Sequence, residues 1–302
     1  VVAYARDRGV RVVVEADMPG HSTSWGVGYP SLLTQCSAGE RPMDPTQDAT
    51  YDFLGQLLQE LSSRFPDAYV HLGGDEVDQT CWKENANVTA WMAKHGIASY
   101  DGVQAEFERR VVELATAPAV NRSVVVWEEV FVNRANWTMP ADTVVEIWKE
   151  RGGDKHVLEE AVRAGLRVLW TSPSWYLDYQ LSGTQLSSDW RFVYSLDPVG
   201  NASITPAQAE LVMGGEVCMW APMQDSTNWL SVVWPRAAAA AERLWSDKTV
   251  TDLTSATTRL RAQRCRTLYR GIGMAPIIPA STDSFCPFYY DFEYVSPFGG
   301  TP

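Results

Sequence analysis

The sequence predicts an α/β protein, specifically a (β/α)8 TIM barrel, and three observations support this fold class. Short apolar runs alternate along the chain with amphipathic segments that suit helices. The apolar runs are nearly continuous, as in parallel strands that are buried on both faces of a sheet. The runs end in carboxylate or aromatic side chains, and barrel enzymes carry their functional groups at this end of each strand. A doubly wound sheet would alternate in the same way, but the sequence lacks the Gly-rich phosphate loop that would favour it.

Six segments are predicted as strands: Val10–Asp17, Ala68–Asp75, Ser123–Val130, Thr143–Lys149, Arg167–Ser174 and Val212–Trp220. The predicted helices are Tyr51–Phe65, Asp101–Ala115, Lys155–Ala164, Ala237–Leu244 and Leu253–Tyr269. Because a complete barrel has eight strands, we expect the first two β/α units to precede residue 1. Strands 3 to 8 of the barrel would then occupy residues 1–246, and residues 247–302 would form a C-terminal helix and extension of the same domain.

The composition excludes several classes of partner. The chain has 302 residues, of which 45% are hydrophobic and 21% charged, which suits one large globular domain. Its net charge of -12 disfavours nucleic acid and anionic membrane surfaces. No apolar run approaches the roughly 20 residues that span a bilayer. Val1 is not a natural start, so we expect the chain to begin partway through a protein.

Cysteines and glycosylation sequons point to the secretory pathway. The five cysteines form no CxxC pair and no Cys/His zinc spacing, so we expect no structural metal. We assign the odd cysteine to Cys218, which lies in an apolar stretch where a free thiol acts as a small hydrophobe. The N-x-[ST] sequons are at Asn87, Asn121, Asn136 and Asn201. Together these features favour a lysosomal or extracellular eukaryotic protein.

The segment His71–Val77 carries the strongest chemical signal. It places Asp75 and Glu76 directly after a short apolar run that ends in Gly-Gly. Glycosidic cleavage needs an acid for the leaving oxygen and a negative charge beside an oxocarbenium-like centre, and this pair can supply both. A lone Asp-Glu pair would more simply cap the following helix. The rest of the chain favours the catalytic interpretation.

A series of motifs runs in order along the chain: Asp17–His21 with Ser24-Trp25, His71–Glu76 with Cys81-Trp82, Trp127–Val130, Trp148, Trp175–Asp178, Gly214–Trp220, Trp234–Ala237 and Ala241–Trp245. In these motifs the chain resembles the family-20 glycoside hydrolases, the β-N-acetylhexosaminidases, and looks closest to the eukaryotic lysosomal or secreted type. The resemblance extends from about Tyr4 to Cys286.

The resemblance implies exo-acting hydrolysis of terminal N-acetylhexosamine residues from β-linked oligosaccharides or glycoconjugates, without a cofactor. The substrate's own acetamido group is then the nucleophile, with retention of configuration. Glu76 would be the general acid and then the base, and Asp75 would orient the acetamido nitrogen and stabilise the oxazolinium intermediate. Repulsion between the two carboxylates should push their pKa values apart, which helps to keep Glu76 protonated.

The resemblance also assigns the residues that bind the sugar. Tyr176 would hydrogen-bond the acetamido carbonyl, although alone it would be taken as a core aromatic at a strand end. Asp178 would bind a sugar hydroxyl. The remaining positions are the wall tryptophans Trp127, Trp148 and Trp220, and the residues near the catalytic pair, His21 and Asp17.

Two disulfides, Cys36–Cys81 and Cys265–Cys286, are likewise implied by the resemblance. One departure from the family pattern lies beside the site, because Ala221-Pro222 stands where relatives carry Gly-Glu. Proline cannot make the sugar contact of that glutamate, so the sequence leaves glucosamine and galactosamine equally open.

Two other functions remain open at this stage. One is a carbohydrate-binding relative that has lost turnover. The other is a barrel glycosidase with a protein nucleophile, for which the candidates are Glu15, Glu128, Glu129 and Glu216. A glycosidase with a protein nucleophile would hydrolyse substrates that lack the 2-acetamido group, and this distinguishes it from an enzyme that needs that group. The resemblance is also compatible with a homodimer.

Overall fold

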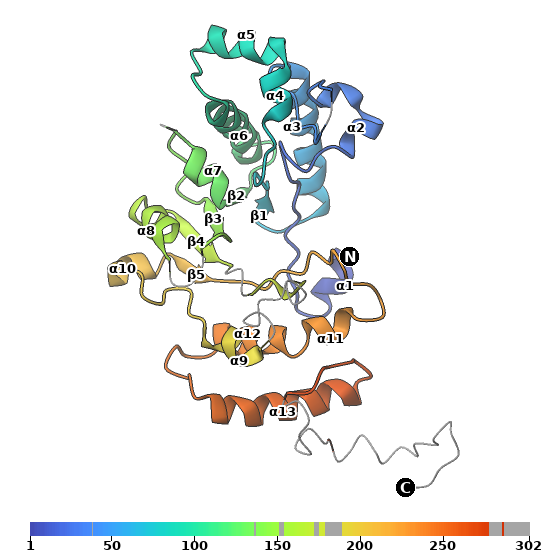
Figure 1. The fold of residues 1–302 in the computed structure, drawn as a ribbon, viewed down its shortest axis with the longest axis vertical. Helices are drawn as coiled ribbons and strands as arrows, with labels where there is room; N and C mark the ends of the chain where they lie inside the picture. Colours follow the sequence, from blue (N-terminus) through green and yellow to red (C-terminus); the bar gives the residue numbers. More distant parts are fainter. Residues whose placement is uncertain are drawn as a thin grey trace, which may run out of the picture. The chain divides into compact units, whose positions relative to one another are not determined.

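The structure, a computed structural model, describes residues 1–37, 39–135, 137–150, 154–171, 175–178, 189–277 and 286. The chain divides into two compact units, which Figure 1 colours along the sequence. Unit 1 comprises Val1–Glu150, Asp154–Leu169 and Ala202–Met213, and unit 2 comprises Arg151–Gly153, Trp170–Asn201 and Gly214–Pro302. The predicted division at residue 246 stays a prediction.

Unit 1 is built on a parallel sheet. Within the described residues its strands are β1 (Tyr69–His71), β2 (Ser123–Trp127), β3 (Val144–Ile147), β4 (Arg167–Trp170) and β5 (Val212–Gly214). They lie side by side in chain order, as Figure 1 shows, and β1, β2 and β3 pair in parallel. Nearly every residue of β2 and β3 is buried, as expected of strands covered on both faces. The parallel α/β fold class is confirmed.

The predicted strand Val10–Asp17 differs from expectation. It forms only an isolated bridge, in which Glu15 pairs in parallel with His71 of β1. The N–H of His71 donates to the carbonyl of Val14 at 2.9 Å, and the N–H of Ala16 donates to the carbonyl of His71 at 2.9 Å. The segment therefore lies beside β1, where a barrel places the preceding strand, although too few residues pair for a continuous strand.

The helices of unit 1 follow from amphipathic pattern and from caps. Ser99 accepts from the N–H of Gly102 at the start of α6, and Asn85 caps α5 in the same way. Helices α3 and α6 pack together through the rings of Tyr51 and Phe107, 5.5 Å apart. The described helices of this unit are α1 (Val2–Arg6), α2 (Trp25–Gly28), η1 (Pro30–Leu32), α3 (Asp48–Arg64), α4 (Thr80–Glu84), α5 (Ala86–His95), α6 (Tyr100–Thr116), α7 (Glu128–Asn133), α8 (His156–Arg163) and α10 (Pro206–Ala209).

Unit 2 has a helical core. Its described helices are α9 (Trp190–Ser195), α11 (Trp229–Val233), α12 (Arg236–Trp245) and α13 (Leu253–Tyr269). The hydroxyl of Tyr194 on α9 donates to Glu242 on α12 at 3.1 Å, and the guanidinium of Arg259 on α13 donates to the same carboxylate. One carboxylate thus joins three helices. The predicted helix Leu253–Tyr269 is confirmed at both ends.

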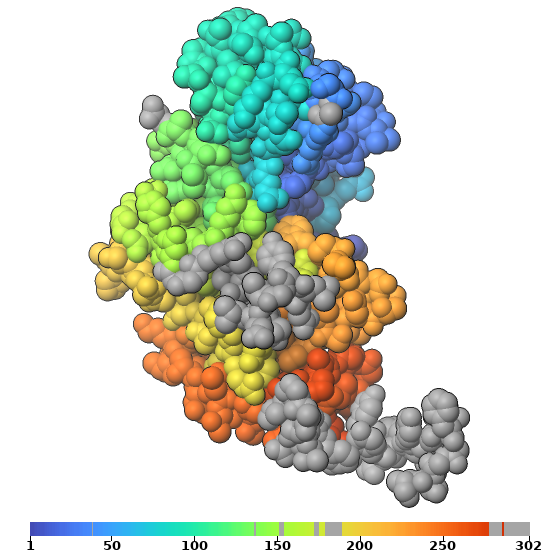
Figure 2. All heavy atoms as spheres, in the orientation of Figure 1, coloured from blue at the N-terminus to red at the C-terminus, as the bar shows by residue number. Residues whose placement is uncertain are grey.

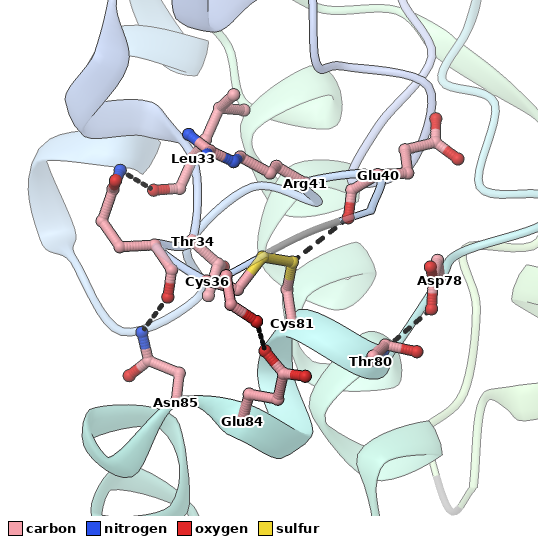
Figure 3. The surroundings of a disulfide bond; sticks show 12 residues. Leu33, Thr34, Cys36, Glu40, Arg41, Asp78, Thr80, Cys81, Glu84 and Asn85 are labelled. Atoms are coloured by element: carbon pink, nitrogen blue, oxygen red, sulfur yellow. Dashed lines mark hydrogen bonds between the residues drawn. A yellow bond between two sulfur atoms is a disulfide. The ribbon is translucent and has the colours of Figure 1, made fainter.

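Both implied disulfides are present, and Cys218 is buried and belongs to neither. Figure 3 shows Cys36 joined to Cys81 of α4. Next to this bond Asn85 Nδ2 donates to the carbonyl of Gln35 at 3.0 Å, so the loop before α3 is attached to α4 in two ways. In Figure 2 this loop (blue) and helices α4 and α5 (cyan) form a continuous surface. The second disulfide joins Cys265 of α13 to Cys286.

The glycosylation sequons stay predictions. Asn87, Asn121 and Asn201 are exposed, as a modified asparagine must be, and Asn136 lies outside the described residues. None of the described helices has the length and apolar character needed to cross a membrane.

Gly73, which follows β1 closely, tests how tightly this turn is packed. Its φ is +69°, and an added Cβ would lie 1.8 Å from Oδ1 of Asp17. Gly96 has almost the same φ, +67°, but open space around it. We expect Gly73→Ala to lower the free energy of unfolding by about 3 kcal/mol or more and Gly96→Ala by about 1 kcal/mol, because only the first adds a collision to the left-handed backbone. Urea unfolding of both variants measures the difference, and equal losses would contradict this packing.

Candidate active site

Carboxylates from two segments of unit 1 meet at the end of β1. Asp17 ends the segment Val10–Asp17, which lies beside β1, and its Oδ1 accepts from the N–H of Gly74 at 3.0 Å. His21 Nε2 lies 3.6 Å from Oδ2 of Asp75 and 3.7 Å from Oε2 of Glu76. Four predicted site residues are therefore brought together: Asp17, His21, Asp75 and Glu76.

The two carboxylates of the motif have different surroundings. The side chain of Asp75 is 16% exposed, whereas that of Glu76 is 54% exposed. Burial, and next the charge of Asp17, raise the pKa of Asp75 to about 7, against the opposite effect of His21. Burial would lower the pKa of His21, but Asp75 and Asp17 outweigh it and raise that pKa. Burial acts on Asp75 because it is the less exposed member of the pair, and the protonated state of Glu76 stays a prediction.

The backbone at this site is strained. Glu76 has a φ of 50° and His21 a φ of 49°, in the left-handed region that non-glycine residues seldom adopt. Each such residue costs on the order of 1 kcal/mol and persists only where its surroundings hold it. Strain of this kind at two contacting residues is typical of a functional site.

An ionic network lies beside the pair, and two of its members, His71 and Glu146, are buried. His71 Nδ1 is 3.2 Å from Glu15 and its Nε2 is 3.4 Å from Glu146, while Trp127 Nε1 donates to Glu15 at 3.0 Å. Burial alone would lower the pKa of His71, but the contacts with Glu146 and Glu15 raise it to about 10. The N–H of Gly73 also lies 3.0 Å from Nδ1, which suits a neutral ring, yet two carboxylates favour the protonated one. The orientation of Trp127 thus depends on this network.

Sequence analysis did not predict the roles of His71 and Glu146. Glu146 is a charged residue inside the apolar strand β3, and it is 2% exposed. A charge at the centre of a strand buried on both faces implies a buried partner, and this was the available signal.

The wall tryptophan Trp148 is held by two adjacent glutamates. Glu128 Oε2 accepts from the N–H of Trp148 at 3.0 Å and from that of Lys149 at 3.2 Å. Glu129 Oε2 accepts from Nε1 of Trp148 at 3.1 Å. Burial raises the pKa of Glu128 to about 7. Glu128 and Glu129, like Glu15, thus accept hydrogen bonds from neighbouring groups. Carboxylates engaged in this way are poorer nucleophiles.

The other predicted site residues form a separate group in unit 2. Tyr176 forms an isolated parallel bridge with Cys218, and Asp178 Oδ2 accepts from the N–H of Trp220 at 3.1 Å. Asp178 Oδ1 is buried and accepts no hydrogen bond from the described residues. Arg236 donates to the carbonyl of Leu177, and burial lowers the pKa of Arg236 to about 10.

The position that departs from the family pattern is also in unit 2. The side chain of Trp220 is largely exposed, and Ala221, which follows it, has a positive φ of 56°. Glu216 is the fourth candidate nucleophile, and its Oε1 lies 3.7 Å from Sγ of Cys218.

One set of described side chains could hold a metal ion. Ligand atoms of Asp17, His21 and Asp75 lie within 4.8 Å of one another. The same three groups can instead share a proton, and the expectation that the chain binds no metal stays a prediction.

Paired carboxylates at the ends of parallel strands are an arrangement that barrel glycosidases use. The family profile for glycosyl hydrolase family 20, catalytic domain, matches residues 1–248. The chain is 42% identical to beta-hexosaminidase subunit alpha of Rattus norvegicus and 37% identical to subunit beta of Homo sapiens, each over 92% of this chain. The Flavobacterium johnsoniae chitobiase superposes with a TM-score of 0.77 at 27% identity, over 90% of this chain and 41% of that one.

The chain belongs to glycosyl hydrolase family 20. It covers 52% of the rat subunit and 49% of the human subunit, and so spans about half the length of these relatives.

The ionic network should make the free energy of unfolding fall as the pH rises into the alkaline range. His71 binds its proton more tightly in the folded protein, where its pKa is about 10, than at the ordinary value of 6.5. Its contribution is therefore complete below pH 6.5 and is lost as the pH rises to about 10, at up to about 1.4 kcal/mol per pH unit. Urea unfolding of the parent protein and of His71→Gln across this range measures it. An equally steep loss in the variant would contradict the assignment.

Asp75→Asn should stabilise the protein at alkaline pH. Asp75 keeps its proton up to about pH 7 when folded, whereas the unfolded chain releases it near 3.8, so the parent loses stability between these values. Asparagine stays neutral, and we expect a gain on the order of 2 kcal/mol at pH 8 that shrinks toward pH 4. Thermal unfolding at the two pH values measures it. A variant less stable than the parent at pH 8 would refute the burial cost.

Proposed function

We propose that this chain carries the catalytic pair of an exo-acting β-N-acetylhexosaminidase, which removes terminal N-acetylglucosamine or N-acetylgalactosamine from β-linked glycosides. The observation that supports this best is the division of surroundings within one motif. Asp75 is buried beside Asp17 and His21, whereas Glu76 is open to solvent at the end of the same strand. A buried carboxylate beside the acetamido group and an accessible one near the leaving oxygen are what this reaction requires.

The first step is an internal displacement. The acetamido carbonyl oxygen of the substrate forms a bond to C1 while the bond from C1 to the glycosidic oxygen breaks. Glu76 gives its proton to that leaving oxygen. Asp75 accepts a hydrogen bond from the acetamido N–H and stabilises the positive oxazolinium. A tethered nucleophile gains effective molarity, and a fixed anion stabilises the cation without reorganisation.

The second step reverses the roles. Glu76 takes a proton from water, the oxygen of that water bonds to C1, and the bond from C1 to the acetamido oxygen breaks. Both displacements invert C1, so the product retains the configuration of the substrate. His21, which contacts both carboxylates, can balance their charge during the two proton transfers.

The binding residues complete the proposal on the strength of the family resemblance. Trp127, Trp148 and Trp220 would pack flat indoles against the sugar and its acetyl methyl group. Tyr176 would donate to the acetamido carbonyl, and Asp178, whose Oδ1 is buried and without a hydrogen bond among the described residues, would accept from a sugar hydroxyl.

The secretory pathway is the proposed location. Two disulfides and three exposed sequons support a lysosomal or extracellular protein. The partners are then β-linked N-acetylhexosamine oligosaccharides or glycoconjugates, and a homodimer belongs to the same proposal.

Hydrolysis of an aryl N-acetyl-β-glucosaminide by the full-length protein tests the function. Glu76→Gln should lower kcat by about a hundredfold or more, because glutamine cannot protonate the leaving oxygen. A folded parent that binds N-acetylglucosamine without turnover would replace the enzyme by a carbohydrate-binding protein. Equal turnover of aryl β-glucosides, which lack the acetamido group, would indicate a protein nucleophile instead.

A further inference from the structure

We propose that Glu129 is a positioning residue for this reaction, whose carboxylate holds the backbone of Glu76 and the indole of Trp148 in fixed relation. The proposal rests on the proposed function and deepens it. We call the contacts of Glu129 with Glu76, Trp148 and Lys149 the Glu129 bridge.

The bridge uses both oxygens of one carboxylate. Oε1 accepts from the N–H of Glu76 across 3.4 Å, and Oε2 accepts from Nε1 of Trp148 at 3.1 Å. Lys149 Nζ lies 2.5 Å from Oε1 and completes the set. The side chain of Glu129 is 12% exposed, whereas those of Lys149 and Glu76 are 47% and 54% exposed, so the carboxylate is buried and two of its partners face solvent.

Glu76 needs such a contact because of its backbone. Its φ of 50° is unfavourable for a residue with a Cβ, and it follows Gly73 and Gly74, which also have positive φ. The groups of Gly74 are held by other partners, since its N–H donates to Asp17 and its carbonyl accepts from Gln104. The partner that the structure gives to the N–H of Glu76 is Glu129.

The bridge also joins two functions of the site. Glu76 would transfer the proton, and Trp148 would pack against the sugar whose oxygen receives it. A rigid link between them sets the distance from the acid to the bound sugar, and proton transfer is sensitive to errors of about 1 Å in such a distance. Glu129 itself touches neither the substrate nor the reacting atoms and acts through these two neighbours.

Lys149 gives the bridge an electrostatic signature. The negative charge of Glu129 helps to raise the pKa of Asp75, which also faces Asp17 and His21. Lys149, whose Nζ lies 2.5 Å from Oε1 of Glu129, carries the opposite charge. The charge of Glu129 also helps to raise the pKa of Glu108 and of Glu128. Removing Glu129 or Lys149 should therefore change the ionisation of Asp75 in opposite directions.

The test compares four variants of the full-length protein on an aryl N-acetyl-β-glucosaminide: Glu129→Ala, Glu129→Gln, Lys149→Met and Glu106→Gln. Glu129→Ala removes the bridge and should lower kcat by about tenfold or more, with a smaller rise in KM. Glu129→Gln keeps one acceptor oxygen and so can keep only one of the two hydrogen bonds, and its kcat should lie between those of Glu129→Ala and the parent. Glu106→Gln, which removes a half-buried glutamate paired with Arg109 on α6, is the matched control and should keep the parent kcat.

The pH profile separates positioning from mere stability. If the ionised form of Asp75 is the active one, Glu129→Gln should move the acid limb of kcat to lower pH, because an anion beside Asp75 is lost. Lys149→Met should move the limb to higher pH, because a cation is lost. A general loss of packing has no reason to produce opposite shifts.

The bridge is refuted if Glu129→Ala keeps kcat within about twofold of the parent. If thermal unfolding shows that Glu129→Ala does not fold, Glu129→Gln and Lys149→Met decide. The bridge is then refuted if the acid limb of kcat in both variants coincides with that of the parent. An unmodified protein without turnover refutes the proposed function, and with it the bridge, before any variant is compared.

Discussion

Two aspartates packed against each other at the end of β1 are the constraint on which the rest of the site depends. Asp17 accepts from the N–H of Gly74, and this approach leaves no room for a side chain at Gly73. Asp75 is buried next to it, so its ionised form is costly and its pKa is raised. His21 reduces that cost by contacting Asp75 and Glu76. The turn geometry, the two glycines and the strained backbone all follow from holding these carboxylates together.

The charges beneath the pair serve a different purpose. In the Glu15–His71–Glu146 network, His71 and Glu146 are buried where apolar side chains would pack with less desolvation. It also fixes the indole of Trp127, whose N–H would otherwise need another acceptor. A buried ionic group that orients a binding residue gives specificity at a cost in stability. Functional sites commonly carry this cost, and a stable sheet such as the one formed by β2 and β3 can support it.

The sequence predicted what depends on local pattern. The valine runs of β2 and β3 and the helix Leu253–Tyr269 are fixed by composition and period, and the structure confirms them. The predicted strand Ser123–Val130 was wrong at its end, because the chain turns into α7 at Glu128. The sequence did not identify the partners of Glu129 and Glu146, because these lie on segments far away in sequence, although the charge inside the apolar strand β3 signalled that Glu146 has a buried partner. Both were therefore considered as nucleophile or strand residues only. The disulfide pairings came from the resemblance to a family, since connectivity cannot be deduced from cysteine positions.

The central claim is that the acetamido group of the substrate is the nucleophile and that Asp75 and Glu76 serve it. A series of aryl glucosaminides whose N-acyl group carries zero, one, two or three fluorine atoms tests this directly, because each fluorine weakens the carbonyl oxygen as a nucleophile. The account predicts that kcat/KM falls steeply along the series. A nearly constant kcat/KM would contradict it, since a protein carboxylate attacking C1 would be insensitive to the basicity of that carbonyl.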